Sequence, residues 1–240
     1  MRRPTRREIA AQDRQMLDRQ AQFRLAADAV TAALAGVSEV EAVALIGSVA
    51  RPLWREVPRF QPFRHWDVPV WHECKDVDLA VWLDRLDRLQ ALDRARSVAL
   101  HQLFKDKQIG VAHHQVEIFI LHGAANTYRG RLCSFSQCPK GKRECLVPGC
   151  GRDPFLQQHA GFRFWPDALA PDRIMPLYDR RRGILRRAAE TPVEGRPIRQ
   201  SGSDLAQIDT GCPMKSSASC KGPAAVFSGD CGPCKTSSAD

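Results

Sequence analysis

The sequence lacks three features that would place it in a special class of protein. No apolar run approaches the ~20 residues that a membrane-spanning helix requires. The basic start at residues 1–7 is followed by polar Gln, Asp and Arg residues instead of the apolar region of a signal peptide. The chain also has no internal repeat. We therefore expect a cytoplasmic protein with no membrane-spanning segment.

The length and composition permit one sizeable domain with an appendage. The chain has 240 residues, of which 43% are hydrophobic and 26% charged, as in ordinary globular proteins. Lys and Arg outnumber Asp and Glu by 36 to 27, which favours a polyanionic partner such as nucleic acid or a nucleoside triphosphate. The arginines at 180–182 and 186–187 are more simply interpreted as a solvated helix face.

The apolar pattern predicts helices and strands in alternation. We expect helices over residues 6–35, from residue 49 toward Pro58, from residue 84 to 110 and over 176–189, with strands over 40–46, 76–83 and 111–122. Asp84 is the expected N-cap of the helix that follows it. Three prolines interrupt residues 57–75, which we interpret as an inserted loop.

The composition changes after residue 190. Residues 191–240 are rich in Ser, Gly and Pro, and Phe227 is their only aromatic residue. So few large apolar groups cannot offset the conformational entropy that ordering would cost. We therefore predict a domain over residues 1–190 and a mostly disordered tail over 191–240.

Asp76 and Asp78 occupy alternate positions of a predicted strand, so their carboxylates point to the same side. Carboxylate oxygens in this arrangement bind Mg²⁺ or Mn²⁺, which can hold a triphosphate and polarise an attacking hydroxyl. Alone, the pattern is also typical of an exposed strand face. Its context strengthens it, because Gly47 and Ser48 end the preceding strand in a turn suited to phosphate. Glu117 lies among apolar residues of the next strand, where a carboxylate is costly unless a charge meets it.

This order of motifs resembles the DNA polymerase β-type nucleotidyltransferase superfamily. Residues 45–51, Leu-Ile-Gly-Ser-Val-Ala-Arg, look like the Gly-Ser-x-Ala-Arg signature of the minimal bacterial nucleotidyltransferases. Residues 75–81, Lys-Asp-Val-Asp-Leu-Ala-Val, resemble the Asp-x-Asp strand of those enzymes. The resemblance covers roughly residues 20–122 and implies an α/β (α+β) fold with a small mixed β-sheet flanked by helices.

The resemblance also implies a role for each residue of the motifs. Gly47 and Ser48 would contact phosphates, and Asp76 and Asp78 would be metal ligands. Glu117 would be the third ligand and would help to deprotonate the acceptor. The implied activity is Mg²⁺-dependent or Mn²⁺-dependent transfer of NMP from an NTP, expected to be ATP, with release of pyrophosphate. The acceptor stays open among RNA, a small molecule and a protein.

The alternative function is a non-catalytic nucleotidyltransferase-like module. Such a module would bind nucleic acid or a partner protein, as an antitoxin-like relative would. The intact Asp76, Asp78 and Glu117 argue against it, because a site that has lost its activity need not keep three carboxylates.

The chain departs from the family pattern in two places. Arg51 would flank the phosphates, but Pro52 follows it where the minimal enzymes usually have Gly. Residues 49–75 also make a 27-residue separation between the two motifs, which is long and consistent with an insertion. This insertion, rich in Trp and Arg, is a candidate acceptor-binding lip. His113 and His114 are interpreted as packing or hydrogen-bonding residues.

Nine cysteines in a chain without an export signal favour metal binding over disulfides. The pattern Cys-x4-Cys, six residues, Cys-x4-Cys predicts a structural Zn²⁺ loop at 133–150, formed by Cys133, Cys138, Cys145 and Cys150. His122 or His159 could replace one thiolate, and four unrelated free cysteines are the alternative. The tail set, Cys212, Cys220, Cys231 and Cys234, is either a second metal site or simply reactive, and Cys74 stands alone.

Overall fold

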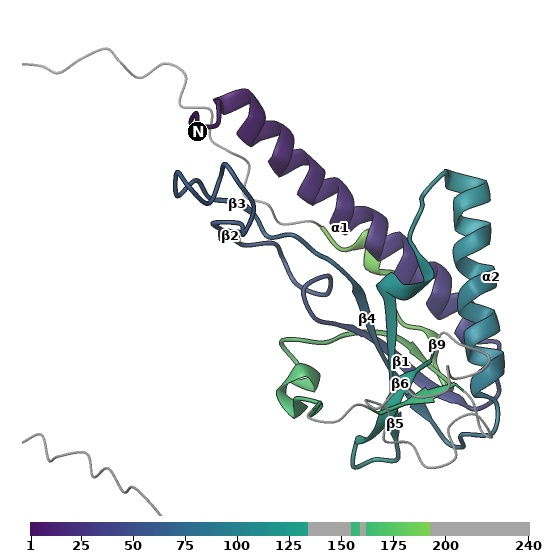
Figure 1. The fold of residues 1–240 in the computed structure, drawn as a ribbon. Coiled ribbons are helices and arrows are strands. Elements are labelled where there is room, and N and C mark those ends of the chain that lie inside the picture. The colour runs from purple at the N-terminus through teal and green to yellow at the C-terminus, as the bar shows by residue number, and fades with distance from the viewer. Residues whose placement is uncertain (134–154, 159–161, 193–240) are drawn as a thin grey trace, which may run out of the picture. The chain divides into compact units, whose positions relative to one another are not determined.

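The computed structural model describes residues 1–133, 155–158 and 162–192. They belong to one unit that extends over residues 1–197 (Figure 1). The helical elements are α1 (Arg6–Leu34), α2 (Leu89–Lys107) and the short 3-10 turns η1 (His113–Gln115), η2 (Pro166–Leu169) and η3 (Ala188–Glu190). The strands are β1 (Val40–Ile46), β2 (Arg55–Glu56), β3 (Val70–Trp71), β4 (Val77–Leu83), β5 (Val116–His122), β6 (Thr127–Leu132), β7 (Leu156–Gln157), β8 (Met175–Asp179) and β9 (Gly183–Ile184). In this part of the chain, no helix is long and apolar enough to cross a membrane.

Helix α1 begins at a capping box and confirms the first predicted helix. Thr5 Oγ1 accepts a hydrogen bond from the Glu8 N–H, and the Glu8 carboxylate accepts one from the Thr5 N–H at 2.8 Å. These two bonds satisfy amide groups that have no partner inside the helix. The seven-residue apolar spacing places Met16, Phe23 and Val30 on one face, where all three are buried.

Seven strands form one mixed sheet in the order β7-β6-β5-β4-β1-β8-β9. Strands β4 and β5 run parallel and are connected through α2, whereas the other neighbouring pairs run antiparallel. A parallel pair needs a crossover connection of this kind, because a short turn cannot return the chain to the same end of the sheet. The predicted mixed α/β architecture is confirmed, with more strands than the pattern of apolar residues indicated.

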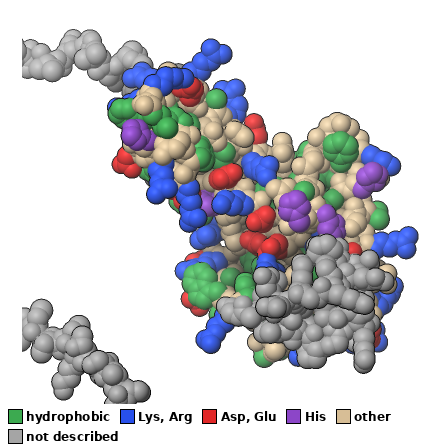
Figure 2. Space-filling model, in the orientation of Figure 1, with side chains coloured by type: hydrophobic (Ala, Val, Ile, Leu, Met, Phe, Trp, Pro, Cys, Tyr) green, Lys and Arg blue, Asp and Glu red, His purple; other side chains and the backbone are tan. Residues whose placement is uncertain are grey.

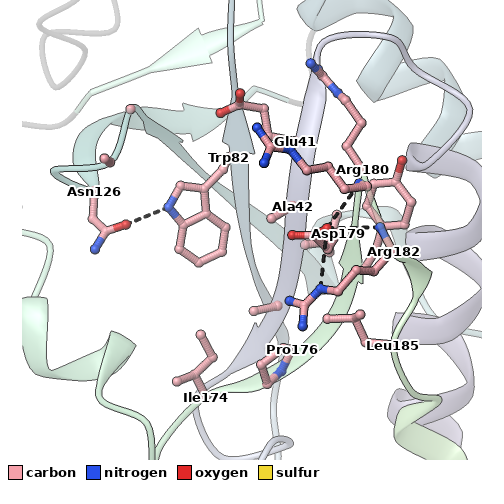
Figure 3. Close-up of a pocket in the computed structure, with 16 residues that line it drawn as sticks. Glu41, Ala42, Trp82, Asn126, Ile174, Pro176, Asp179, Arg180, Arg182 and Leu185 are labelled. Carbon is pink, nitrogen blue, oxygen red and sulfur yellow. Dashed lines mark hydrogen bonds and ion pairs between the residues drawn. The ribbon is translucent and has the colours of Figure 1, made fainter.

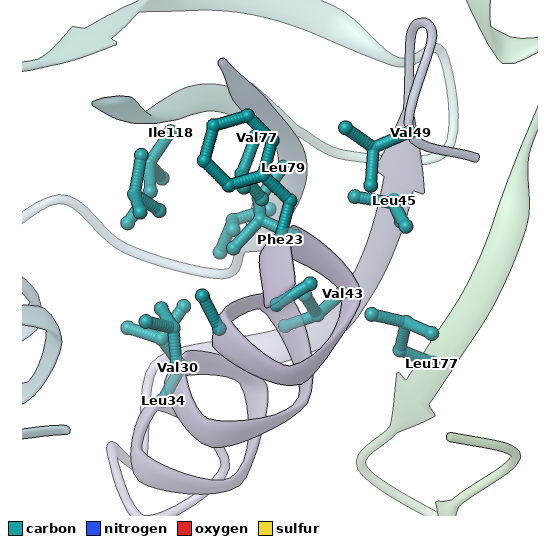
Figure 4. Packing of buried hydrophobic residues seen from close by; sticks show 14 of the residues in the cluster. Phe23, Val30, Leu34, Val43, Leu45, Val49, Val77, Leu79, Ile118 and Leu177 are labelled. Carbon is teal, nitrogen blue, oxygen red and sulfur yellow. The ribbon is translucent and has the colours of Figure 1, made fainter. Parts of the chain in front are cut away.

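Both long helices pack on one face of this sheet. Val77, Leu79 and Val81 of β4 point toward the helices and are fully buried, as the strict alternation of the strand predicted. Figure 4 shows Phe23 and Val30 of α1 packed against Val43 of β1 and the neighbouring strands. This apolar layer fixes α1 across the sheet.

The opposite face of the sheet has a smaller apolar cluster. Ile46, Ala80, Phe119 and Leu121 are buried there beneath residues of the segment 162–174. The alternation of β4 therefore directs Asp78, Ala80 and Trp82 to this second face. Charged and apolar side chains consequently share it.

The short helix predicted from residue 49 is wrong, because residues 47–51 form a turn. In a helix, the carbonyl oxygen of Ser48 would accept from the N–H of residue 52, but Pro52 has none. Side chains of α1 bind the turn carbonyls instead. Gln20 Nε2 donates to the Arg51 oxygen at 2.7 Å, and Arg24 Nε donates to the Val49 oxygen at 3.2 Å.

The helix predicted over residues 176–189 is also wrong, since this segment forms β8, β9 and η3. Met175 and Leu177 alternate toward the buried face of the sheet, and β8 pairs with β1. The arginines at 180–182 therefore follow a strand and are not a helix face. The apolar spacing in this segment fitted both a strand and a helix.

Asp84 does not cap α2, contrary to the prediction. The helix begins five residues later, with Arg88 at the N-cap and no side-chain cap. The Asp84 carboxylate accepts instead from Arg180 Nη1 at 2.9 Å. This contact joins the end of β4 to the turn after β8.

Residues 57–75 form the predicted loop apart from the two residues of β3, and β2 lies directly before them. Strands β2 and β3 pair antiparallel, with Arg55 opposite Trp71. Asp13 of α1 anchors the hairpin, since its carboxylate accepts from the Trp71 N–H at 3.0 Å and from Arg55 Nη1 at 2.9 Å. In Figure 1, β2 and β3 lie beside the N-terminal half of α1. The strand predicted over 111–122 begins only at Val116, after the turn η1.

Candidate functional site

The predicted carboxylates lie where β1 ends and where β4 and β5 begin. Asp78 of β4 is the register partner of Ile46 at the end of β1 and of Glu117 in β5. Asp76 stands just before β4, two residues from Asp78. Three segments far apart in the sequence thus bring Gly47, Asp76, Asp78 and Glu117 to one edge of the second face.

Gly47 is required by the geometry of this edge. Its φ is +73°, a backbone conformation that residues with a Cβ rarely adopt. A Cβ added at Gly47 would lie 2.4 Å from Asp78 Oδ2. The glycine therefore allows the Asp78 carboxylate to lie against the backbone of the turn.

The carboxylates repel one another in this partly buried position. Burial, followed by the charges of Glu117 and Asp76, raises the pKa of Asp78 to about 7. The pKa of Asp76 is also raised, by burial and by Glu117, while His114 and Lys75 act in the opposite direction. A cluster of this kind is stabilised by an added positive charge.

Arg131 of β6 supplies one positive charge. Its Nη1 lies 2.6 Å from Glu117 Oε2, and its guanidinium lies over the rings of Phe119 and Phe162. The expectation that a charged group meets Glu117 is thus satisfied by a residue that sequence reasoning did not identify. The only signal in the sequence was the cost of a carboxylate among apolar residues, which does not tell which strand lies next to β5.

Ser48 and Arg51 of the turn take different positions. Ser48 lines the cavity beside the carboxylates and hydrogen-bonds the Cys74 thiol. Burial raises the pKa of that thiol, and the Ser48 contact and Arg24 act against the rise. Arg51 directs its guanidinium over the Trp54 ring, 5.2 Å from the ring centroid.

A cavity of about 670 Å³ opens between the β2–β3 hairpin and the carboxylates. Its lining is Ser48, Glu56, Val57, Pro58, Arg59, Phe60, His72, Glu73, Lys75, Asp76 and Asp78. This volume is in the range of sites for small molecules and nucleotides. In Figure 2, acidic side chains gather in a hollow near the centre of the view, with basic side chains and histidines beside them.

No metal cage is already assembled among residues 1–133, 155–158 and 162–192. There, no group of three or more His, Cys, Asp or Glu residues is close enough to hold an ion. The Glu117 carboxylate is directed to Arg131, which explains why Asp76 and Asp78 are not joined by a third ligand.

The predicted zinc loop lies largely beyond the part of the chain that the structure describes. Cys138, Cys145, Cys150 and His159 fall outside it, as do the tail cysteines. Cys133 is buried, and its N–H donates to the Phe155 carbonyl at 2.6 Å. The Nδ1 of His122 is engaged with the Leu83 carbonyl oxygen at 2.8 Å. His113 contacts Arg96 and Asp93, as a hydrogen-bonding residue would.

A second cavity, of about 620 Å³, lies at the far end of the same sheet face. Trp82 forms one wall, and its ring nitrogen donates to Asn126 Oδ1 at 2.7 Å (Figure 3). Ala42 and Ala44 of β1 line this cavity as well, together with Arg181 and Arg182. Trp82 lies four positions after Asp78, which corresponds to about 13 Å along the strand, so the two cavities are separate.

No family model, curated protein or solved structure matches the chain.

Proposed function

We propose that this protein is a Mg²⁺-dependent nucleotidyltransferase that moves NMP from an NTP, with ATP the first candidate, to an acceptor. Pyrophosphate is the second product. The nucleotidyltransferase fold suggested by the sequence motifs is part of the proposal. So is the assignment of Gly47, Ser48 and Arg51 to the phosphates and of Asp76, Asp78 and Glu117 to the metal.

The observation that carries the proposal is the Asp78 carboxylate at the Gly47 turn. Asp78 lies beside two other carboxylates, and burial with their charges raises its pKa to about 7, although the charge of Arg131 acts in the opposite direction. The ion pair of Arg131 is made to Glu117, and within the described residues no hydrogen bond or ion pair to Asp78 is seen. The turn has the glycine that its approach requires, so the arrangement favours a ligand that brings positive charge.

The donor set fits Mg²⁺ or Mn²⁺, because hard cations prefer carboxylate oxygens. Asp76 and Asp78 would be the first ligands, and Glu117 would join them on leaving Arg131. A bound cation would hold triphosphate oxygens and offset the charge that develops during transfer.

The remaining residues would position the reactants. Ser48 lines the cavity, where it can meet phosphate oxygens. Arg59 and Lys75 also line the cavity and add positive charge around a polyanionic nucleotide. In the reaction, the acceptor oxygen bonds to the α-phosphorus, and the bond to the pyrophosphate oxygen breaks.

The test is transfer of label from α-labelled ATP to fractions of a cell extract, separated into RNA, small molecules and proteins. The wild-type protein should label one fraction in the presence of Mg²⁺. Asp78→Ala should reduce labelling about 1000-fold or more, because a bound metal contributes several kcal/mol to such a reaction. Asp172→Ala, at a side chain that is 80% exposed, is the matched control and should label normally. Undiminished labelling by Asp78→Ala would end the proposal.

The second candidate is a non-catalytic binding module, which the Glu117–Arg131 ion pair favours. An active site with its third carboxylate committed to an arginine must rearrange before it can act. A titration with ATP, with and without Mg²⁺, separates the two candidates. An enzyme should bind ATP with an affinity that depends on Mg²⁺, whereas a module that binds nucleic acid or protein need not bind ATP in this way.

The zinc loop at 133–150 is proposed as a structural element of the same protein. Cys133, Cys138, Cys145 and Cys150 would hold one Zn²⁺ as thiolates. Metal analysis of protein purified without chelators should find about one equivalent of zinc. Less than about half an equivalent would favour free thiols.

A further inference from the structure

His72 stands at the end of β3, inside the cavity that also holds Asp76 and Asp78. Its Nδ1 lies 2.9 Å from Glu56 Oε1. A carboxylate only accepts hydrogen bonds, so Nδ1 is the donor and carries a proton. In the neutral ring, Nε2 is then the basic nitrogen.

The imidazole is held in one orientation by its neighbours. Trp54 stacks on it with ring centroids 3.9 Å apart, and the Trp54 ring nitrogen donates to the other Glu56 oxygen at 3.0 Å. The His72 N–H donates to the Trp54 carbonyl at 2.8 Å. Glu56 thus binds both rings, and the backbone fixes the distance between them.

The hairpin that bears this cluster is itself anchored. Trp71, the residue before His72, is tied to Asp13 of α1 through its N–H, and its ring is covered by the Arg55 guanidinium at 4.2 Å. A side chain built on such a support keeps its position relative to the sheet.

Nε2 of His72 is the ring nitrogen that remains available. The side chain is 21% exposed, and among the residues that the structure describes no hydrogen bond or ion pair involves Nε2. Glu117, the residue expected from the sequence to assist deprotonation, is bound by Arg131 at 2.6 Å. The oxygen that would take the proton is thus already bound by the guanidinium, and Glu117 would have to leave Arg131 first.

We propose that His72 is the general base of the reaction and that Glu56 is its positioning residue, an inference that rests on the proposed nucleotidyl transfer. His72 Nε2 takes the proton of an acceptor hydroxyl, and the acceptor oxygen bonds to the α-phosphorus. The bond between the α-phosphorus and the bridging oxygen breaks, and pyrophosphate leaves with that electron pair. The proton passes from the imidazolium to solvent. Arg59, Glu73 and Lys75 are the other charged groups of the cavity that surround this step, together with Asp76 and Asp78.

The protonation of the His72 ring can be tested without measuring enzymatic activity. A long-range ¹H–¹⁵N spectrum of the full chain should show His72 protonated at Nδ1 and not at Nε2 in its neutral form. Glu56→Ala should abolish this preference. The opposite tautomer in the wild-type protein would overturn the assignment, since Nε2 would then have no lone pair to offer.

The role of His72 in the reaction is tested by measuring label transfer from α-labelled ATP to the extract fraction that the wild-type protein labels. His72→Gln should lower kcat about 100-fold or more and leave the KM for ATP unchanged, because the base acts in the chemical step. Added imidazole should restore part of the rate to His72→Gly. His65→Gln is the matched control, an exposed histidine of the same insertion that is not part of the cavity lining.

The outcomes separate this inference from the function on which it rests. Thermal unfolding of His72→Gln shows whether the variant is folded, so a lost rate in a folded protein counts for the proposal. If His72→Gln transfers label at the wild-type rate while Asp78→Ala is inactive, His72 is not the general base, but the proposed transferase function stands. A wild-type protein that labels no fraction would remove both.

Discussion

The two faces of the main sheet are made by alternate residues of the same strands, yet they differ in kind. On the helix-covered face, Val77, Leu79 and Val81 of β4 are completely buried against α1 and α2. On the opposite face, Asp78 and Trp82 border cavities. The helix-covered face is a mainly apolar layer in which Arg24 and Arg96 are buried and bind backbone carbonyls, and the other face combines charge with open space.

This difference separates the residues that stabilise the fold from those that offer chemistry. Burial of apolar area is favourable at every position of the covered face. The carboxylates on the other face oppose folding at neutral pH, because they are partly desolvated and repel one another. Sites of this sort are commonly retained for a function that offsets their cost. Each substitution below tests this contrast.

The largest loss of stability is expected from Leu79→Ala on the covered face. Leu79 is completely buried, and truncating such a leucine costs about 2–5 kcal/mol through lost transfer energy and the cavity left behind. The neighbouring change Asp78→Asn should cost nothing at pH 7 or should stabilise the protein. Urea unfolding at pH 7 measures both, with the exposed Val98→Ala as control. Equal losses in the two variants would contradict the division between faces.

The second prediction concerns pH. The pKa of Asp78 is raised from 3.8 to about 7, so between these values the folded state binds more protons than the unfolded state. Raising the pH through this window should therefore lower the unfolding free energy, and Asp78→Asn should flatten that fall. Urea unfolding in EDTA at several pH values measures the slope.

Asp84→Asn provides a control of opposite sign for the pH prediction. The hydrogen bond from Arg180 lowers the pKa of Asp84, so its contribution to stability is present above the unfolded pKa and lost as the pH falls. Asp84→Asn should lower the unfolding free energy at neutral pH and change it little at acidic pH. The same slope in both variants would mean that a general charge effect, and not the site, dominates.

Gly47→Ala should lower stability by a smaller amount than Leu79→Ala. A control at Gly183 separates the part due to backbone strain from the part due to the Asp78 carboxylate. Gly47 and Gly183 both have positive φ, +73° and +78°, so alanine at either position meets backbone strain of about 1–3 kcal/mol. Only at Gly47 would the added Cβ meet the Asp78 carboxylate, whereas nothing lies within 4 Å at Gly183. Gly47→Ala should therefore be less stable than Gly183→Ala and should alone weaken Mg²⁺-dependent ATP binding. Equal ATP binding in both variants would show that the close approach to Asp78 is unimportant.

The sequence predicted the covered face well because its signals are local. The spacing of Met16, Phe23 and Val30 indicated α1, and the alternation of Val77 and Leu79 indicated β4 and its buried side. Each pattern repeats within a few residues, so no knowledge of distant partners is needed. The β1 strand and its end at Gly47 were recognised in the same way.

The sequence failed where distant contacts override local pattern. Side chains of Gln20 and Arg24 hold the turn after Gly47, where we predicted a helix. β8 was mistaken for helix, since only its pairing with β1 makes it a strand. For the candidate site, Asp76, Asp78 and Glu117 were predicted from their residue types. Arg131 and His72 were not, because the place of their segments beside the carboxylates depends on the order of strands and on the hairpin.

The last prediction concerns Arg131→Gln, whose effect is measured in metal binding and sharpens the role of the charged face. The Arg131 and Glu117 side chains are 23% and 31% exposed, so their ion pair is screened less than a pair at the surface. The same change frees the Glu117 carboxylate and removes a positive charge from the site. Mn²⁺ affinity without nucleotide should then rise about 3- to 10-fold, corresponding to roughly 1 kcal/mol of lost competition. Arg129→Gln, at an exposed residue of the same strand, should bind Mn²⁺ as the wild-type protein does. A weaker Mn²⁺ complex in Arg131→Gln would mean that Arg131 keeps the carboxylates in place for the metal, and the ion pair would then be part of the site and not its competitor.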